Sequence, residues 1–412
     1  MSPIYPSPLC DAGYDVKDYL SIDPRLGTME NFHQLVTFLK DNGCGLLMDL
    51  VLNHTSTEHR WFKEHPEYYC WASADRKDWK NLFDEGSAWH YHEGQGEYYL
   101  SMFHPRQADL NYFPDGPNGD LNEPLIKEFR QIVDFWMERG VAGFRLDAAQ
   151  VINKDIRKDS FDPLETCTLY KSMAAKVIQA IFGEGEQKKA YLLMECLDMD
   201  GSMVGYYSQY VNAVMNNLPI NLIEPTSGQQ AERGCLAKFL EEVRRGVEKH
   251  PDSFAHVTES HDGQRAPSLF GVDGPTAIQA LFGVYEGQRF FTPCVIVMYQ
   301  GQELGLCNPA ETELSNELML ALDAKTTMLH GRGAPLSELR SKSRANSRVP
   351  VPMEEYAHQE AAKGSCLWVA IDCLIKWRRL THWWTNDWPA PYVRAFLYPK
   401  FERLILFQLR DI

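Results

Sequence analysis

This sequence lacks the patterns that mark several common classes of protein. Its ten cysteines contain no Cys-x-x-Cys pair and several lie in apolar runs, which favours buried free thiols over a disulfide framework or a zinc site. No apolar run reaches the length of a membrane span, and the opening MSPIYPSPLC lacks the charged start and apolar stretch of a signal peptide. Positive charge is scarce: the net charge of −15 disfavours nucleic acid or an anionic membrane as partner.

Amphipathic helices alternate with short apolar strands along most of the chain. A helix is predicted at 28–43, because Phe32, Leu35, Val36 and Leu39 fall on one face, and it precedes an apolar strand at 46–52. Further helical stripes at 125–136, 169–181, 236–243 and 277–284 precede strands at 143–149, 191–195, 254–257 and 294–298, respectively, and a weaker strand lies near 212–217. This alternation predicts a parallel α/β fold, for which a (β/α)₈ TIM barrel is the natural closed form.

Two stretches interrupt the alternation. Residues 55–106 are rich in aromatics and too long for an ordinary loop, so we expect a small inserted domain with a core of its own. Residues 306–362 are polar and are expected to be irregular. A last helix at 366–380 and two strands at 392–396 and 403–407 complete the chain.

The segment GFRLDAA, residues 143–149, places an arginine and an aspartate inside an apolar strand. Either charge alone is costly to bury. Residues i and i+2 of a strand point to the same face, so Arg145 and Asp147 share one side while Phe144 and Leu146 share the other. The pattern predicts a polar cavity on one face and core on the other, although a structural ion pair is the simpler alternative.

Charged residues also gather at the ends of other strands. Asp147, Glu195 and Asp262 follow three predicted strands, and in a barrel enzyme the active site lies at the carboxyl ends of the strands. A pair of carboxyl groups can cleave a glycosidic bond, one as nucleophile and one as general acid. The same acids could bind a metal, but the denser His or Asp clusters of such sites are missing. The pattern therefore favours a sugar substrate.

Several ordered motifs resemble one known family. MDLVLNHTS, GFRLDAAQV, LLMEC and VTESHD resemble the four conserved regions of the α-amylase superfamily, glycoside hydrolase family 13. SPIYPSPLCDAGYDVKDY and QADLN are similar to its oligo-1,6-glucosidase and α-glucosidase branch, and MYQGQELG resembles the segment that closes its eighth strand. The resemblance runs from residue 2 to about residue 305.

The resemblance implies a retaining mechanism. It assigns Asp147 as the nucleophile that forms a covalent glucosyl-enzyme, Glu195 as the acid/base, and Asp262 as the carboxylate that binds the distorted sugar ring. Arg145 is expected to keep Asp147 ionised through its charge.

The resemblance also implies a set of substrate-binding residues. His54 and His261 match donors to the glucose hydroxyls, while Asp11 and Tyr14 match a pair that grips the non-reducing glucose. Arg265 matches a further substrate-contacting position. After the nucleophile, the branch tends to carry valine in enzymes that prefer α-1,6 bonds; this chain has Ala148, which favours α-1,4 bonds.

The alignment with this family implies a division of the chain. Residues 1–54 correspond to the barrel from the end of its second strand to its third, 55–106 to the inserted domain B, 107–385 to the rest of the barrel, and 386–412 to the start of a C-terminal β-domain. The barrel is therefore expected to lack its first strand and most of its second. The family's calcium-type loop follows the first strand, so we expect no metal, and no cofactor is implied.

These expectations converge on an exo-acting α-glucosidase that releases glucose from a small oligosaccharide or disaccharide, with no nucleic-acid or membrane partner. A transglycosylase or isomerase, of the trehalose synthase or sucrose isomerase type, remains an alternative. A non-catalytic fragment, or a relative resembling the heavy chains of amino-acid transporters, is another. The oligomeric state stays open, and so does the compartment, with the cytoplasm as the default.

Overall fold

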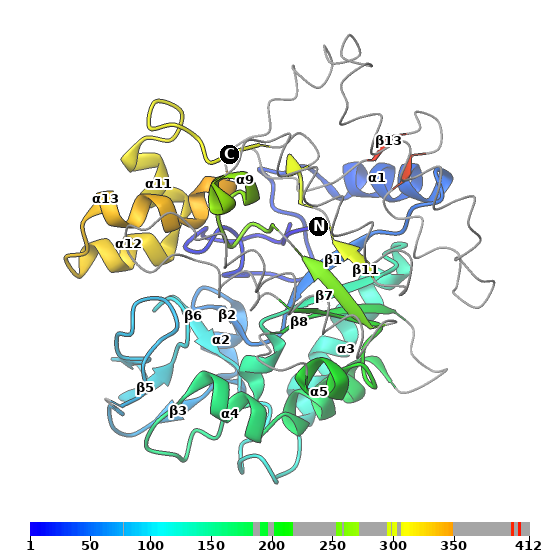
Figure 1. Cartoon of the computed structure of the whole chain (residues 1–412). Helices are drawn as coiled ribbons and strands as arrows, with labels where there is room; N and C mark the ends of the chain where they lie inside the picture. Colours follow the sequence, from blue (N-terminus) through cyan, green and yellow to red (C-terminus); the bar gives the residue numbers. More distant parts are fainter. Residues whose placement is uncertain are drawn as a thin grey trace.

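Six parallel strands form the central sheet of the computed structural model, which describes residues 1–76, 78–183, 190–196, 202–216, 253–257, 259–271, 295–297, 299–302, 306–348, 397–398 and 403–404. The strand order is β1-β7-β8-β9-β10-β11, and each strand runs parallel to its neighbours, as in a (β/α)₈ barrel (Figure 1). The strands are β1 Leu47–Val51, β7 Gly143–Asp147, β8 Tyr191–Cys196, β9 Ala213–Asn216, β10 Phe254–Val257 and β11 Val295–Val297. Five of them lie within the stretches where the sequence predicted strands, and β8 extends one residue beyond its predicted stretch of 191–195.

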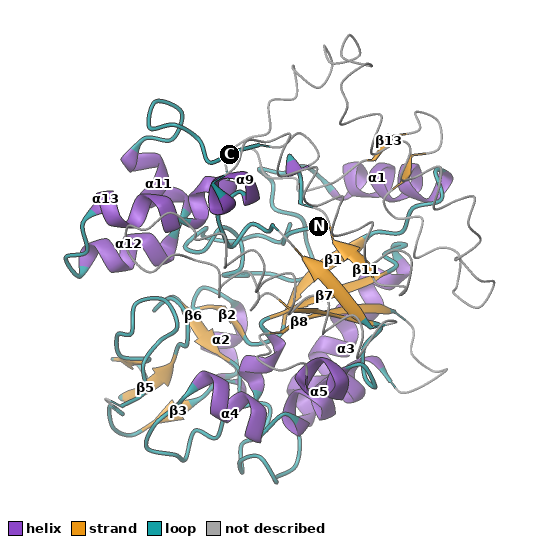
Figure 2. Ribbon diagram, viewed as in Figure 1, coloured by secondary structure: helices purple, strands orange, loops and turns teal. Residues whose placement is uncertain are grey.

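Amphipathic helices cover the sheet, with α3 and α5 packed side by side against it (Figure 2). Helix α1, Met29–Asp41, begins at Thr28, whose side chain accepts a hydrogen bond from the Asn31 backbone in a capping box. Helix α3 spans Glu123–Glu138 and α5 spans Ser172–Phe182. The stripe predicted at 169–181 is two helices, because α4, Pro163–Leu169, ends before α5 begins. The helices predicted at 236–243, 277–284 and 366–380 lie outside the described residues.

The two faces of β7 differ as the sequence predicted. Phe144 and Leu146 have no solvent exposure and belong to the main hydrophobic cluster, whereas Arg145 and Asp147 are bonded to each other on the opposite face. One face of this strand therefore supports the fold and the other supplies polar groups.

The stretch 55–106 forms short elements around two small antiparallel sheets, β2-β6 and β3-β5-β4. Its elements, together with the strand residues that flank it, are β2 His54–Ser56, α2 Arg60–Glu64, the 3₁₀ helix η1 Pro66–Tyr68, β3 Trp71–Ala72, β4 Trp89–His92, β5 Glu97–Leu100 and β6 Gln107–Asp109. Its aromatics do not share one core: Trp61 and Tyr69 pack into the main cluster, whereas Trp79 and Trp89 form a second cluster that also includes Phe161.

The segment 306–348 is helical rather than irregular, which corrects the sequence-based expectation. Its elements are α11 Asn316–Leu322, α12 Ala324–Gly331, α13 Leu336–Leu339 and the 3₁₀ helices η5 Arg340–Lys342 and η6 Arg344–Ser347. Leu314, Met319 and Ala345 form its small core. These helices lie near the short helix α9, Ala266–Phe270 (Figure 1). An ion pair between Arg332 and Asp84 links the segment to 78–106.

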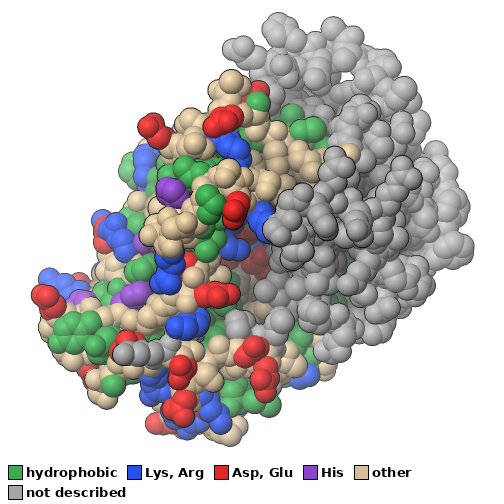
Figure 3. Space-filling view, turned by 60° about the vertical axis from the view of Figure 1, so that its left-hand side comes forward, with side chains coloured by type: hydrophobic (Ala, Val, Ile, Leu, Met, Phe, Trp, Pro, Cys, Tyr) green, Lys and Arg blue, Asp and Glu red, His purple; other side chains and the backbone are tan. Residues whose placement is uncertain are grey.

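Among the described residues, the 3₁₀ helix η2 Ala149–Ile152, α6 Ser202–Tyr207 and α9 also lie between strands of the central sheet. A short antiparallel pair, β12 Leu397–Tyr398 and β13 Arg403–Leu404, lies near the end of the chain. On the face shown in Figure 3, acidic and basic side chains are interspersed around small hydrophobic areas. Within the described residues, no helix is long and apolar enough to cross a membrane. The six described cysteines are free thiols, and Cys70, Cys167 and Cys196 are buried, although Cys307 is exposed.

Candidate active site

Arg145 lies at the centre of a cluster of carboxyl groups. Its Nη1 donates to Asp49 Oδ1 at 2.5 Å and to Asp147 Oδ1 at 2.9 Å, and its Nη2 donates to Glu195 Oε2 at 2.8 Å. The arginine side chain is only 11% exposed, so these ion pairs are shielded from water. The carboxyl groups come from β1, β7 and β8, which are neighbours in the sheet, so residues far apart in sequence meet here.

Tyr14 and His261 connect this cluster to Asp262. The Tyr14 hydroxyl donates to Asp49 Oδ2 at 2.9 Å and lies 2.7 Å from His261 Nε2. The two rings are stacked, with their planes 5° apart. His261 Nε2 also lies 3.0 Å from Asp262 Oδ2. The predicted residues Tyr14, His261 and Asp262 thus form one continuous polar network with Arg145.

Two arginines that the sequence did not single out complete the other side of the site. Arg348 Nη2 donates to Asp262 Oδ1 at 3.0 Å. Arg344 donates to Asp11 Oδ1 at 3.0 Å through Nη2 and to Asp262 Oδ1 at 3.4 Å through Nη1. Both arginines come from the 306–348 segment, in or just after η6, so that segment contributes directly to the site.

Gln107 joins Asp11 to His54. Its side-chain amide donates to Asp11 Oδ2 at 3.2 Å and lies 3.0 Å from His54 Nε2. His54 is buried, and burial lowers its pKa although the charges of Asp109 and Asp11 oppose this. His54 is therefore a neutral imidazole at pH 7, with Gln107 of β6 beside its Nε2.

The same neighbours shift the pKa values of Asp147 and Glu195. Burial raises the pKa of both carboxyl groups; the Arg145 charge lowers both, and the Asp49 charge raises both. The prediction that Arg145 simply keeps Asp147 ionised is therefore corrected. The guanidinium is shared among Asp49, Asp147 and Glu195, so burial outweighs its effect on any one of them.

Asp262 has the opposite tendency. Burial alone would raise its pKa, but the charges of His261, Arg348 and Arg344 outweigh burial and hold the pKa well below its usual range. Burial lowers the pKa of His261 to about 4, against the effect of Asp262. At neutral pH this side of the site therefore contains an ionised carboxylate beside a neutral imidazole.

Ala148 has a strained backbone directly after Asp147. Its φ of 42° lies in the left-handed region, where a β-branched side chain is disfavoured. Its backbone N–H donates a hydrogen bond to Glu195 Oε2 at 3.3 Å. The strained turn thus brings the Asp147 strand end and Glu195 together.

Arg265 lies apart from the cluster, unlike the other predicted residues. Its side chain is fully buried and donates to Glu259 Oε1 at 2.6 Å and to the Gln300 carbonyl at 2.7 Å. It also lies 4.9 Å above the Tyr299 ring. As placed here, Arg265 has no exposed surface with which to contact a sugar, and its contacts are those of a residue that orders the loop after β10.

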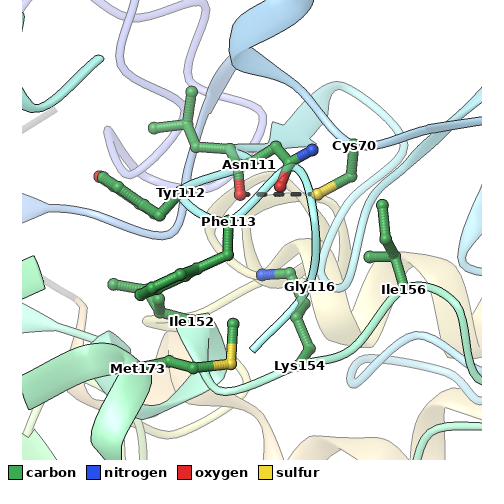
Figure 4. Close-up of a pocket in the computed structure, with 10 residues that line it drawn as sticks. Cys70, Asn111, Tyr112, Phe113, Gly116, Ile152, Lys154, Ile156 and Met173 are labelled. Atoms are coloured by element: carbon green, nitrogen blue, oxygen red, sulfur yellow. Dashed lines mark hydrogen bonds between the residues drawn. The ribbon is translucent and has the colours of Figure 1, made fainter. Parts of the chain in front are cut away.

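Beneath the insert, a second buried ion pair lies beside a small pocket. Lys154 Nζ is 2.9 Å from Asp109 Oδ2 and donates to Asn53 Oδ1 at 2.7 Å. Figure 4 shows Lys154 among apolar side chains such as Phe113 and Met173, with room for about one water molecule. This pocket is too small for a sugar and is lined by none of the residues around Arg145. Within the described ranges, no three His, Cys, Asp or Glu side chains are grouped to hold a metal ion.

The fold and these strand-end acids define a protein class that comparison with known proteins identifies. Residues 1–375 match the family described as "Alpha amylase, catalytic domain", and the chain belongs to this family. It is 31% identical over 388 residues to trehalose-6-phosphate hydrolase of Bacillus subtilis, covering 85% of this chain and 66% of the relative. It is 31% identical over 406 residues to glucan 1,6-alpha-glucosidase of Streptococcus pneumoniae, covering 90% and 70%.

A solved structure shows the same fold. The trehalose-6-phosphate hydrolase of Bacillus licheniformis superposes with a TM-score of 0.70 at 30% identity, covering 85% of this chain and 66% of that one. The expected TIM-barrel class is therefore confirmed. The chain spans about two thirds of the length of these relatives.

Proposed function

We propose that this chain is a retaining, exo-acting α-glucosidase acting on short oligosaccharides or disaccharides, with α-1,4 bonds preferred over α-1,6 bonds. The observation that carries the proposal is the sharing of one guanidinium: Arg145 bonds Asp147 and Glu195, from adjacent strands, through its two terminal nitrogens. Two neighbouring carboxyl groups are what a retaining glycosidase requires.

In the first step Asp147 attacks the anomeric carbon of the sugar as the bond from that carbon to the leaving oxygen breaks. Glu195 gives its proton to the leaving oxygen, so the aglycone departs as an alcohol and a covalent glucosyl-enzyme remains. Burial raises the pKa of Glu195, which favours a protonated acid, but it raises the pKa of Asp147 as well, so the division of roles rests on the match of each residue to the family's motifs.

In the second step Glu195 takes a proton from water, and the water oxygen attacks the same carbon. The bond to Asp147 breaks, which restores its carboxylate and releases glucose with retained configuration. Asp262 is held ionised at neutral pH by Arg348 and Arg344, so it can stabilise positive charge that develops on the ring in both steps.

The arrangement around Asp11 supports cleavage at a chain end. Asp11 accepts hydrogen bonds from Arg344 and Gln107, which belong to separate segments on either side of it. Arg348 joins Arg344 on Asp262. On this proposal these contacts close the pocket beyond the first glucose, while Tyr14 stacks against that glucose.

The charge of the described site favours an uncharged sugar over a phosphorylated one. Its acidic side chains outnumber its guanidiniums, which are those of Arg145, Arg344 and Arg348; the acids are Asp11, Asp49, Asp147, Glu195, Asp262 and Asp323. A net negative cluster of low exposure repels a phosphate group. We therefore expect trehalose to be a better substrate than trehalose 6-phosphate, although trehalose-6-phosphate hydrolases are among the relatives.

Release of glucose from maltose, isomaltose, sucrose, trehalose and trehalose 6-phosphate by this chain tests the proposal. The matched control is Asp147→Asn, which keeps the shape of the side chain but removes the nucleophile. Maltose cleavage that this substitution abolishes supports the proposal, and a preference for isomaltose would overturn the linkage assignment. A transfer or isomer product in place of glucose would favour a transglycosylase. No product from any sugar would point to a non-catalytic fragment.

A further inference from the structure

The 306–348 segment contains a buried carboxylate that touches the candidate site only through Arg344. Asp323 lies at the start of α12 and is 1% exposed. Its Oδ1 accepts from Arg344 Nε at 2.8 Å, and its Oδ2 accepts from the Arg344 backbone N–H at 2.8 Å. The Thr326 hydroxyl, at 2.6 Å, and the Ser343 hydroxyl, at 3.0 Å, also donate to Oδ2.

Donors other than the Arg344 side chain also hold the Asp323 carboxylate in place. Asp323 also accepts from the Lys325 backbone N–H, so both oxygens are saturated with donors from its own segment. Burial alone would raise its pKa, but the charges of Arg344 and Arg348 and its hydrogen bonds outweigh burial, so the carboxyl stays ionised at all ordinary pH. Asp323 is therefore a fixed negative charge on a rigid support.

The guanidinium of Arg344 is bound to Asp323 at one edge and reaches the candidate site with its two terminal nitrogens. Its Nε is bound to Asp323, whereas Nη2 and Nη1 extend to Asp11 and Asp262. The guanidinium also lies 4.8 Å from the Phe83 ring centre. Because a guanidinium is planar, fixing Nε on one partner and a face on another sets where the two terminal nitrogens point.

We propose that Asp323 is a positioning residue for sugar binding: by fixing the Nε edge of Arg344, it sets the direction in which Arg344 holds Asp11 and Asp262. The proposal rests on the proposed function, in which Asp11 grips the terminal glucose. Without Asp323, Arg344 keeps its charge but loses its orientation, so Asp11 is free to turn from its binding position.

The simpler alternative is that Asp323 only caps α12 and braces the segment. In Asp323→Asn the remaining oxygen keeps the cap of α12 and still accepts from Arg344 Nε, because Oδ1 accepts both bonds, but the charge is lost and an N–H group faces the Arg344 backbone N–H. The substitution therefore keeps the cap and weakens the hold on Arg344. Thr326→Val is the matched control: it removes one hydrogen bond to Asp323 and disturbs the same helix, but leaves the contact between Asp323 and Arg344 intact.

The test measures KM and kcat for maltose, the dissociation constant for glucose by calorimetry, and Tm. Loss of one charge-assisted hydrogen bond predicts that Asp323→Asn raises KM and the glucose dissociation constant about tenfold, with a smaller change in kcat. Thr326→Val should lower Tm but leave KM and glucose affinity unchanged. Asp323→Glu, which restores the charge, should recover part of the affinity.

The outcomes separate this inference from the proposed function. Wild-type protein that neither cleaves maltose nor binds glucose contradicts the proposed function itself. Wild-type protein that does both, with KM and glucose affinity unchanged in Asp323→Asn, contradicts the positioning role. Equal losses of affinity in Asp323→Asn and Thr326→Val would assign Asp323 a structural role only and so also overturn the inference.

Discussion

Asp49 and Arg145 lie directly opposite each other on adjacent parallel strands, and Arg145 Nη1 is 2.5 Å from Asp49 Oδ1. The same nitrogen donates to Asp147, so two carboxylates compete for one N–H group and one positive charge. The Asp49 charge also raises the pKa of Asp147 and of Glu195. Asp49 therefore tunes the candidate catalytic pair without being a member of it.

Replacing Asp49 by asparagine should move the pH profile of kcat/KM to lower pH. The substitution removes a negative charge that raises both pKa values, so Asp147 loses its proton at lower pH and Glu195 does too. The acidic limb, which reports loss of the ionised nucleophile, and the alkaline limb, which reports loss of the protonated acid, should both shift in the acidic direction. Maltose cleavage measured from about pH 3 to about pH 9, which covers ordinary and raised carboxyl pKa values, gives both limbs of the profile.

Asp155→Asn is the control for this experiment. Asp155 is also a buried aspartate paired with an arginine, Arg157, but that ion pair lies outside the cluster around Arg145. Its profile should match that of the wild type. A profile for Asp49→Asn that stays in place, or moves to higher pH, would contradict the tuning role.

Arg145→Lys should lower kcat/KM by roughly 10²–10³, the typical loss when one preorganised charged donor is removed. Lysine keeps the charge but offers one nitrogen in place of a planar fork, so it cannot hold Asp147 and Glu195 together. Circular dichroism should show retained secondary structure. Arg139→Lys, at the end of α3, is the control and should retain wild-type kinetics. Activity within about twofold of wild type in Arg145→Lys would show that the shared guanidinium is dispensable.

The sequence predicted this part of the site because it follows from local rules. A period of two placed Arg145 and Asp147 on one face, and apolar strands marked where Glu195 would end up beside them. Parallel strands then bring their carboxyl ends to one edge whatever the sequence distance between them. The sequence does not show how deeply these side chains are buried. The structure was therefore needed to show that Asp49 and Glu195 share Arg145 with Asp147, and how this affects the pKa of Asp147.

Arg344, Arg348 and Gln107 could not be predicted by those rules. The first two come from a segment with no clear helical or strand period, and Arg344 reaches Asp11 from 333 positions along the chain. Such contacts depend on how short helices pack, which local propensity does not encode. Arg265 was predicted to contact substrate because it follows the Ser260-His261-Asp262 motif. In the structure its guanidinium instead pairs with the fully buried Glu259, a partner that the motif does not reveal.

Lys154→Met should destabilise the fold by about 3–5 kcal/mol, because it leaves Asp109 buried without its cation. Lys154 also bonds Asn53, directly before β2, so its loss should loosen the base of the insert. Thermal and urea unfolding measure the effect. Lys158→Met, at an exposed position four residues on, is the matched control and should change the unfolding free energy by less than about 0.5 kcal/mol. A similar small change in Lys154→Met would show that the buried ion pair contributes little.

Gly143 is required where β7 passes β8, and its substitution should damage stability and activity together. A Cβ at this position would stand 1.9 Å from the Tyr191 carbonyl oxygen, on backbone that cannot rotate away. Gly143→Ala must therefore push β8 from β7, at a cost of about 1–3 kcal/mol or more. Because β7 carries Asp147 and β8 carries Glu195, the two carboxyl groups should separate as well, so kcat should fall even in protein that remains folded at the assay temperature.

Gly331→Ala is the same chemical change as Gly143→Ala, but it is expected to stabilise the protein. Gly331 is the last residue of α12, and a Cβ there meets no atom within 4 Å. Alanine should stabilise the helix by up to about 1 kcal/mol, because it restricts the unfolded chain more than glycine does. Differential scanning calorimetry of both variants, with kcat measured well below each Tm, separates loss of folded protein from loss of geometry. A Gly143→Ala protein with wild-type Tm and kcat would show that β7 and β8 can separate without disturbing the site.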